Sequence, residues 1–581
     1  MRKGKANPII HEKGNYLLLL VLSNIVGAMA AMAAILLRGI IGFVHNALFL
    51  GEFSFIHNPT TYVITSRGNL VILLPIIGFA LAALLTRFAP ESRGPGVPEV
   101  MEAVFKREGK IRTRVALIKA LASGLTIGSG GSAGREGPIV QTASSLASSI
   151  GQAFKIPASD LIVLVSCGAA GGIAATFNAP IAGALFAIEL LLPELTTRNV
   201  LPLFMSTAIA AFIGRSVLGN SPAFNIPSFF LQSGWELILY AIFGVVAAFV
   251  AGIFVKTLGW FDRFFHSTKF PAFVRPVSAG LIVGFIGWCF HRFSPTGQFH
   301  VFGVGYDTLS DIFMGANMPL TILLLLVAAK ILVTSLTIGS GGSGGIFAPS
   351  LFIGGTTGAA FGVLVNTIFP EITAQPAAYA LVGMAAVTAG TTRATLAAIV
   401  IIFEMTLNYS IILPLMLASV ISDVIFYEVF HESIYDAKLR PKGIHFDLDR
   451  SVELSRLIMA KEVMTTTVSA LQWNDSLEKA FQRFRVDSVH YYPILRDGVP
   501  VKVIDLGSVD YTLPQSTPVQ DLTDVDPILV EPETLLHAVI QRMSEEDQGV
   551  AFVIHNDRLA GIITRKDIMR GIAEKRRLLF A

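Results

Sequence analysis

A glycine-rich segment occurs twice in this chain, and each copy lies within apolar sequence. Residues 119–140 read KALASGLTIGSGGSAGREGPIV and residues 330–351 read KILVTSLTIGSGGSGGIFAPSL, matching at 12 of 22 positions at an offset of 211. Each glycine costs a helix about 1 kcal/mol relative to alanine, so this composition predicts broken helices. Such breaks expose backbone N–H groups to a small charged ligand. A repeated pair of breaks in hydrophobic sequence therefore predicts an ion site shared by two halves of a membrane transport protein, with an anion as the favoured ion.

The charged residues divide the chain into two regions. The 581 residues are 53% hydrophobic and 15% charged, with a mean hydropathy of +0.64, whereas soluble proteins have roughly 25% charged residues. Residues 441–581 hold 38 of the charged side chains, and the preceding 440 residues hold the other 47. The composition thus predicts a membrane domain followed by a soluble one. The net charge of +3 is too small to indicate a nucleic-acid partner.

The N-terminus resembles a secretory signal, because basic residues precede an apolar run that contains an Ala-Met-Ala box at 28–30. The run continues over residues 16–37, however, and about 22 residues are enough to span a bilayer. We therefore expect a cytoplasmic segment over 1–15 and a first membrane helix after it. Cys167 and Cys289 lie in apolar sequence and offer neither a disulfide framework nor a metal site.

Further apolar segments follow, and several are too short to cross a hydrocarbon core of roughly 30 Å. Broken backbone at membrane depth is tolerated only where protein buries it or where it lines a wet cavity. The predicted breaks include GAAGG at 168–172 and Asn-Ala-Pro at 178–180. The segments are 69–86, 161–192, 201–212, 237–257, 279–290, 320–338, 379–389, 397–403 and 411–426.

A second pair of segments extends the repeat. Residues 168–189 align with residues 383–404 at an offset of 215, and both begin in glycine and end in an apolar run closed by glutamate. Two homologous halves are predicted, at about 65–215 and 275–430. The alignment alone leaves open whether the halves run parallel or inverted.

The pattern from about residue 455 is that of a soluble α/β domain. Short strands are predicted at 493–495, 501–504, 528–530, 551–554 and 561–564, with amphipathic helices at 477–484, 535–543 and 566–575.

The sequence GREGP at 134–138 is the most specific functional motif in the chain. Glu136 lies at the start of a predicted helix, where N–H groups and the macrodipole stabilise a carboxylate. The same groups would stabilise an anion, so the side chain and a permeant ion can compete for one site, and protonation would release Glu136. Glu136 is thus predicted to be both gate and proton carrier. The structural alternative is a helix cap paired with Arg135.

These motifs resemble the CLC family of chloride channels and transporters over nearly all of the chain. The glutamate motif is matched at 134–138, and a second family signature is matched by GIFAP at 345–349. The resemblance implies inverted halves of tilted, broken helices over 16–440, a homodimer and one anion path per subunit. It implies that Glu136 is the gating glutamate. It also implies that the backbone N–H groups of Ile346 and Phe347 and the hydroxyl of Tyr435 hold the central anion, with Pro95 and Gly96 of the first anion motif at the same site. An interfacial aromatic anchor is the alternative for Tyr435.

Two departures from the family pattern concern selectivity and protons. The first anion motif is usually Gly-Ser-Gly-Ile-Pro, whereas this chain has GPGVP at 94–98, and Pro95 has neither a hydroxyl nor an N–H. Proline at this position resembles the nitrate-preferring members, so nitrate is an alternative to chloride. The inner glutamate of the clearest exchangers is replaced by Leu190, and Glu189 would lie about 100° round the helix. Channel and proton-coupled exchanger both remain open.

The tail resembles a tandem CBS pair at 460–511 and 517–575, joined to the membrane domain by a linker at 441–459. The second copy carries Thr564 and Asp567 at a spacing that suits the phosphate and ribose of an adenine nucleotide. The alternative is a dimerisation platform without a ligand. No other cofactor and no metal are expected.

Lys119 and Arg393 lie beside glycine-rich breaks, where they would add positive potential to the anion path. Lys330 matches Lys119 in the repeat, so snorkelling from a helix end is an equal alternative.

The sequence thus predicts an all-α, multi-pass membrane protein with a cytoplasmic α/β tail. It would move chloride, or nitrate as the alternative, as a voltage- or pH-dependent channel or in exchange for protons. The plasma or inner membrane is the expected location, with both termini cytoplasmic. A membrane enzyme is disfavoured because no histidine lies in the glycine-rich repeats. A nucleotide sensor without transport would not need Glu136, and a cation channel would need acidic rings.

Overall fold

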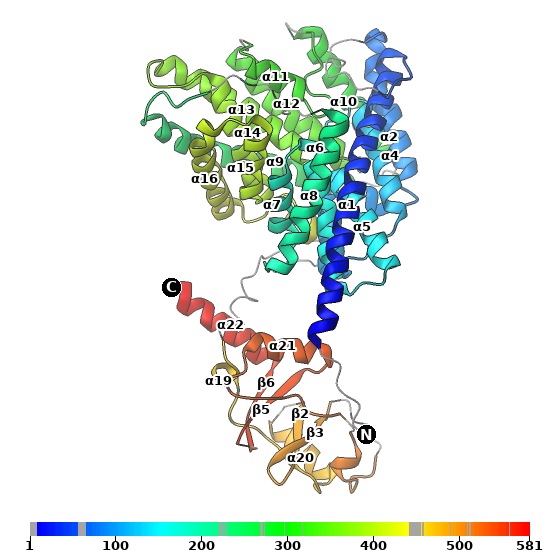
Figure 1. The fold of residues 1–581 in the computed structure, drawn as a ribbon, viewed down its shortest axis with the longest axis vertical. Helices are drawn as coiled ribbons and strands as arrows, with labels where there is room; N and C mark the ends of the chain where they lie inside the picture. The colour runs from blue at the N-terminus through cyan, green and yellow to red at the C-terminus, as the bar shows by residue number, and fades with distance from the viewer. Residues whose placement is uncertain are drawn as a thin grey trace. The chain divides into compact units, whose positions relative to one another are not determined.

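The computed structural model forms two compact units, Met1–His445 and Phe446–Ala581 (Figure 1). It describes residues 8–580 except 56–64, 194, 220–223, 225, 227–228, 268–270, 272, 295–296, 317, 441–454, 456–457, 488–489, 508, 510–512, 524 and 557. The predicted N-terminal segment therefore lies partly, and the predicted linker mostly, outside the described residues. The first helix begins at Pro8, ahead of the predicted membrane span.

Every secondary-structure element described in the first unit is a helix, as the sequence predicts. Its principal helices are α1 Pro8–His45, α2 Leu74–Leu85, α3 Val97–Lys106, α4 Arg114–Gly128, α5 Glu136–Ala153, α6 Ala158–Phe177, α7 Pro180–Leu190, α8 Thr197–Leu218, α9 Glu236–Ser267, α10 Val274–Phe293, α11 Tyr306–Phe313, α12 Leu320–Gly339, α13 Phe347–Ile368, α14 Pro376–Thr392, α15 Thr395–Thr406, α16 Ile412–Phe430 and α17 Asp436–Leu439. Short 3-10 or π turns, η1 Asn46–Leu50, η3 Gly68–Leu73, η4 Pro90–Ser92 and η5 Tyr409–Ile411, join some of them.

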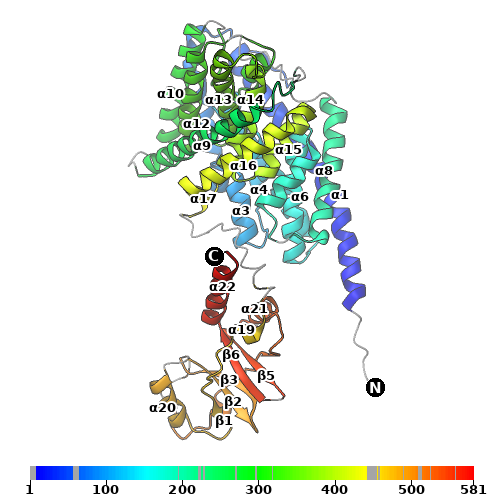
Figure 2. The ribbon, with the colours of Figure 1, turned by 90° about the vertical axis from the view of Figure 1, so that its left-hand side faces the viewer.

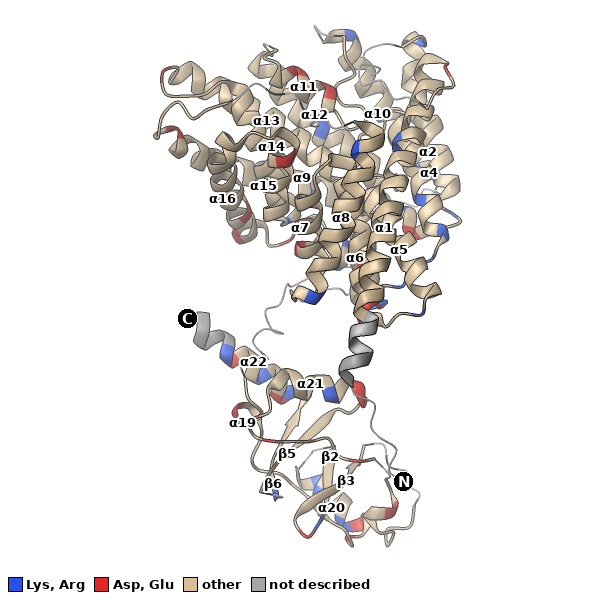
Figure 3. Ribbon diagram, viewed as in Figure 1, with Lys and Arg blue, Asp and Glu red and all other residues tan. Residues whose placement is uncertain are grey.

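Nine helical stretches within the described residues are long and apolar enough to cross a membrane. Figure 3 shows that most of their length carries no charged residue. The helices α7 and α15 are apolar but short, as the predicted breaks require. At the break over 178–180, Asn178 adopts a left-handed conformation with φ 59° and Pro180 starts the next helix. The predicted apolar helices and the interruption at 178–180 are therefore confirmed. The break predicted at 168–172 is wrong, because α6 runs unbroken through it and the glycines serve close packing instead: a Cβ on Gly168 would lie 2.6 Å from the carbonyl oxygen of Ala143.

The helices α5 and α13 are absent from the predicted apolar segments. Most residues of both are buried, and α13 is nevertheless apolar enough to count among the nine membrane-length helices. A Cβ on Gly354 would lie 2.1 Å from the carbonyl oxygen of Gly383, and one on Gly358 would lie 2.0 Å from that of Tyr379. Small residues let the helix backbones approach this closely.

The two halves have opposite directions in the membrane unit. The Glu189 carboxylate at the end of α7 accepts hydrogen bonds from the first amides of α15, Leu396 (2.9 Å) and Ala397 (2.8 Å). The Glu404 carboxylate at the end of α15 accepts from the first amides of α7, Ile181 (3.2 Å) and Ala182 (2.8 Å). Matched helices that cap each other end to end must be antiparallel, so the halves are inverted repeats.

The second unit contains two copies of one strand–helix–strand–strand motif (Figure 2). The sheets have the orders β1-β2-β3 and β4-β5-β6, and in each the first pair is parallel and the second antiparallel. All predicted strands and helices of the tail are present, and β1 is additional. Its elements are α19 Ala460–Val463, β1 Leu471–Gln472, α20 Leu477–Asp487, β2 Tyr491–Arg496, β3 Val499–Asp505, η7 Val519–Asp521, β4 Leu529–Val530, α21 Leu536–Glu545, β5 Val550–His555, β6 Arg558–Thr564 and α22 Arg565–Phe580.

The two copies exchange their leading segments. Ile458, Ala460 and Val463 belong to the hydrophobic core of the second copy. In return, Val519 belongs to the core of the first copy. The tail is thus one interlocked body rather than two separate domains in sequence.

Candidate functional site

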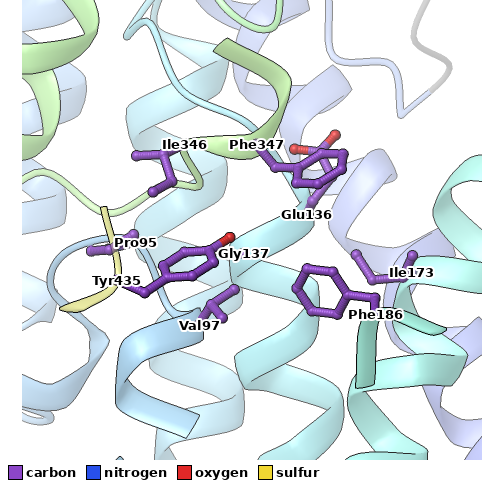
Figure 4. A pocket seen from close by; sticks show the side chains of 9 residues that line it. All are labelled: Pro95, Val97, Glu136, Gly137, Ile173, Phe186, Ile346, Phe347 and Tyr435. Carbon is purple, nitrogen blue, oxygen red and sulfur yellow. The ribbon is translucent and has the colours of Figure 1, made fainter. Parts of the chain in front are cut away.

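One enclosed pocket of the membrane unit gathers most of the residues predicted to bind the anion (Figure 4). The starts of α3, α5 and α13 meet there, so three helix N-termini with their positive dipole ends face one small volume. Among the predicted residues, Gly96 is not a lining residue, but its neighbours on both sides are. The lining residues are Pro95, Val97, Glu136, Gly137, Ile173, Phe186, Ile346, Phe347 and Tyr435.

The two copies of the glycine-rich repeat pair with each other and so position the N-termini of α5 and α13. Gly134 and Gly345 exchange backbone hydrogen bonds of 2.7 and 2.6 Å across an antiparallel bridge. A Cβ on Gly345 would lie 2.7 Å from the amide nitrogen of Gly137, so only glycine permits this approach. The matched hydroxyl pairs Ser123–Ser343 (2.9 Å) and Ser132–Thr334 (2.8 Å) lock the two copies together. The breaks are therefore the joint that places α5 opposite α13.

The Glu136 side chain is 1% exposed and closes one end of the pocket. Its Oε1 accepts a hydrogen bond of 3.0 Å from the hydroxyl of Tyr306 on α11. Its other oxygen lies over Gly134, and the backbone N–H of Ala348 at the start of α13 faces the carboxylate. The carboxylate thus lies against the same kind of N-terminal dipole that would attract an anion. Arg135 does not form an ion pair with Glu136 in the described structure, and its guanidinium lies 5.9 Å from the Tyr306 ring centre.

The Tyr435 hydroxyl points into the pocket (Figure 4). Tyr435 is 1% exposed, and within the described structure its hydroxyl has no hydrogen-bond partner. A buried hydroxyl is seldom left without a partner, so this donor is available to an anion. The burial does not fit an interfacial anchor, which would lie at the membrane surface. The Phe347 ring lies beside Glu136 and packs against Phe186 at 6.2 Å between ring centres.

The Pro95 end of the pocket has few free donors. Pro95 has no N–H, and the Gly96 N–H is bonded to the Glu99 carboxylate at 2.8 Å. Pro98 also lacks an N–H, which leaves the amide of Val97, a lining residue, as the donor nearest the pocket at this helix end. The serine hydroxyl that is usual in the family has no substitute in the side chains of this loop.

At the C-terminal end of α7, neither Leu190 nor Glu189 offers a free carboxylate. Leu190 is 3% exposed. Both oxygens of Glu189 accept hydrogen bonds from the start of α15. Glu189 is therefore committed to a structural cap that holds the two halves together.

A contribution of Lys119 and Arg393 to the positive potential of the anion path stays a prediction. The snorkelling reading was wrong for Lys119 and Lys330. Each side chain is fully buried rather than snorkelling. The Lys119 ammonium donates to the carbonyls of Ser92 (3.2 Å) and Gly94 (2.8 Å), and the Lys330 ammonium donates to those of Val301 (3.2 Å) and Gly303 (2.9 Å). These lysines fix the loops before α3 and α11 at equivalent places.

In the tail, Thr564 and Asp567 lie together at the junction of β6 and α22. Asp567 Oδ2 accepts from the amide (3.0 Å) and hydroxyl (2.6 Å) of Thr564, and Oδ1 accepts from Thr465 (3.1 Å) and Arg570 (2.8 Å). This network caps α22 and joins the exchanged segment to the second copy. The nucleotide site stays a prediction, because a ligand would have to replace some of these contacts.

Sequence reasoning missed five residues of the site: Val97, Gly137, Ile173 and Phe186 in the pocket lining, and Tyr306 behind Glu136. The repeat held a signal for Tyr306. The loop GPGV at 94–97 matches GVGY at 303–306, and the lysine contacts place the two loops equivalently.

Comparisons with known proteins agree with this geometry. A family model described as voltage gated chloride channel matches residues 77–426, and a CBS domain model matches residues 519–574. The chain is 34% identical over 372 residues to a ClcB-like protein of Ralstonia nicotianae, covering 63% of this chain and 84% of that one. It is 31% identical over 387 residues to the H(+)/Cl(-) exchange transporter ClcA of Vibrio campbellii, covering 64% and 80%.

A solved structure of a slow cyanobacterial Cl-/H+ antiporter superposes with a TM-score of 0.61 at 27% identity, covering 73% of this chain and 97% of that one. The family model spans more than half of the chain, and the inverted halves and tail copies are those that the resemblance implies. The chain is a multi-pass membrane protein that belongs to the voltage gated chloride channel (CLC) family.

Proposed function

We propose that this protein moves chloride across a membrane in exchange for protons, with Glu136 as both gate and proton carrier. The carrying observation is the position of the Glu136 carboxylate, which is buried at the pocket and lies against the start of α13. An anionic side chain at that place occupies the position that a permeant anion would need.

The chemistry of the exchange follows from this competition. An ionised Glu136 blocks the path, because two anions cannot share one N-terminal dipole. When Glu136 binds a proton it loses its charge and leaves, and chloride enters in its place. The Tyr435 hydroxyl and the pocket amides hold the halide by hydrogen bonds without a fixed positive charge, so the ion can leave again.

The relatives favour exchange over a channel. The chloride/proton exchange transporter of Vibrio campbellii and the cyanobacterial antiporter are related to this chain at 31% and 27% identity. Because Leu190 occupies the position of the inner glutamate, protons would have to reach Glu136 from the inner side without a carboxyl group at that position. The Ralstonia relative, whose name marks it as a chloride channel candidate, keeps the channel as the alternative outcome.

Liposomes that contain the purified protein test the proposal. The reversal potential is measured in a fixed chloride gradient, with and without a pH gradient. A potential that moves with the pH gradient supports coupled exchange. A potential that follows chloride alone would mean a channel in which Glu136 is only a gate, and no anion current at all would reject transport.

Nitrate is the alternative substrate that the Pro95 loop favours. Replacing chloride by nitrate in the same vesicles measures the preference directly. A reversal potential that places nitrate ahead of chloride would assign this protein to nitrate transport.

The proposed assembly is a homodimer with one pathway in each subunit. The symmetric pair α7 and α15 presents exposed Ile181 (48%) and Leu396 (56%) on an apolar surface that a second copy or lipid can cover. The proposed location is the plasma or inner membrane with both termini cytoplasmic. Light scattering of the detergent-solubilised protein measures the subunit number, and a single-subunit mass would reject the dimer.

A further inference from the structure

The hydroxyl of Tyr306 is the side-chain donor that holds the Glu136 carboxylate in the described structure. It lies 3.0 Å from Oε1, and Tyr306 comes from the second half of the repeat, 170 residues further along the chain. The other carboxylate oxygen has no side-chain donor in the described structure. Tyr306 is therefore placed to decide how long the carboxylate stays in the pathway.

The loop before Tyr306 is built to hold that hydroxyl in place. The buried Lys330 ammonium binds two carbonyls of the loop and also lies 4.7 Å from the ring centre of Phe352. Gly305 has φ +83°, and a Cβ there would lie 2.4 Å from the Phe352 ring. The loop therefore has little freedom, and α11 begins with Tyr306 in a fixed place.

The ring of Tyr306 is packed independently of its hydroxyl. Phe224 contacts it edge-on, with ring centres 5.4 Å apart. The guanidinium of Arg135 lies 5.9 Å from the ring centre. Loss of the hydroxyl alone would leave these contacts intact, so a phenylalanine at this position isolates the hydrogen bond.

We propose that Tyr306 is a positioning residue that latches ionised Glu136 in the anion pathway and releases it when the carboxylate is protonated. This proposal rests on the proposed role of Glu136 as gate. A hydrogen bond to a charged acceptor is roughly twice as strong as one to a neutral acceptor. The latch is thus strong while Glu136 blocks the path and weak once Glu136 carries a proton.

Other charged and titratable groups face Glu136 and stay unchanged in the test. Arg135 precedes it on the same segment, and Arg38 on α1 lies close enough to interact with Arg135. Tyr435 faces Glu136 from the far side of the pocket. The test must therefore separate the hydrogen bond of Tyr306 from this constant electrostatic background.

The test is Tyr306→Phe, measured as chloride turnover against pH in liposomes. Removing the hydrogen bond is expected to raise turnover near neutral pH by roughly tenfold, the effect of losing a bond to a charged acceptor. The pH of half-maximal turnover should move upward by about one unit, because a proton then competes with a less stabilised carboxylate. An unchanged or downward-shifted pH profile would overturn the latch.

The decisive control is to make Tyr306→Phe in a protein that already carries Glu136→Ala. With the acceptor removed, Tyr306→Phe should change neither turnover nor pH profile, whereas a persistent effect would assign Tyr306 a purely structural role. Tyr379→Phe, at a buried tyrosine away from the pocket, should behave like wild type. The coupling of chloride to proton movement is measured separately in the wild-type protein. If that coupling is absent, the proposed exchange is rejected, but the effect of Tyr306→Phe on gating can still be observed.

Discussion

The two halves of the membrane unit share one plan in their scaffold and differ where the ion site lies. Lys119 and Lys330 hold equivalent loops, and Glu189 and Glu404 cap each other's helices. In contrast, when the two copies of the repeat are aligned, the position of Glu136 in the first half is occupied by Phe347 in the second. Residues that obey the symmetry support the fold, and residues that break it line the pathway.

The loops before α3 and α11 show the same rule in finer detail. Both are held by a buried lysine, but the first loop ends in Val97 at the pocket and the second ends in Tyr306 at the gate carboxylate. Because the halves are inverted, the two loops approach the pathway from opposite sides. One fold thus supplies a lining residue on one side and a latch on the other.

The largest expected effect, a loss of proton coupling, concerns Glu136 and its repeat counterpart Phe347, which differ most between the two halves. Glu136→Ala should abolish proton coupling, so that the reversal potential of reconstituted protein no longer moves with a pH gradient, because no carboxyl group remains at the pocket. Phe347→Leu, its counterpart, should retain coupling while changing the chloride turnover. Coupling that survives Glu136→Ala would break the link between asymmetry and proton transport.

The next effect concerns the symmetric lysines. Lys119→Met and Lys330→Met each leave two buried carbonyls without their charged donor, and each should lower stability by about 3 kcal/mol. Thermal unfolding of the purified variants measures this. Similar losses are expected for the two because the contacts are equivalent, whereas a change in anion selectivity with unchanged stability in either variant would contradict the scaffold role.

Much of this plan can be read from the sequence, because the glycine repeat and the breaks at 178–180 are local features. Pro95, Glu136, Phe347 and Tyr435 were predicted and lie at one pocket. The helix α5 was missed because serine, alanine and glycine rather than large apolar residues make up much of it. Tyr306 was missed because its partner lies 170 residues away, and only the pairing of the two halves brings them together.

The reciprocal caps should give a smaller, paired effect. Glu189→Gln and Glu404→Gln keep the shape of the side chain and remove its charge at a helix N-terminus, so each should cost about 1 kcal/mol. Thermal unfolding measures the loss, and the reversal potential in a pH gradient serves as the second readout. We expect coupling to survive both substitutions. Loss of coupling in Glu189→Gln alone would show that this glutamate carries protons and is more than a cap.

The smallest expected effect lies in the loop before α3, where the pocket lacks a donor. Pro95→Ser adds a hydroxyl and an N–H at the end where Val97 has the nearest amide, and one hydrogen bond of about 1 kcal/mol corresponds to a roughly fivefold change in affinity. The permeability ratio of chloride to nitrate should rise by about that factor, measured from reversal potentials under bi-ionic conditions. Val304→Ser, at the matched position of the second loop, is the control and should leave the ratio unchanged. An equal ratio in wild type and Pro95→Ser would mean that selectivity is set by the shared parts of the pocket, the Tyr435 hydroxyl and the start of α13, rather than by the loop in which the two halves differ.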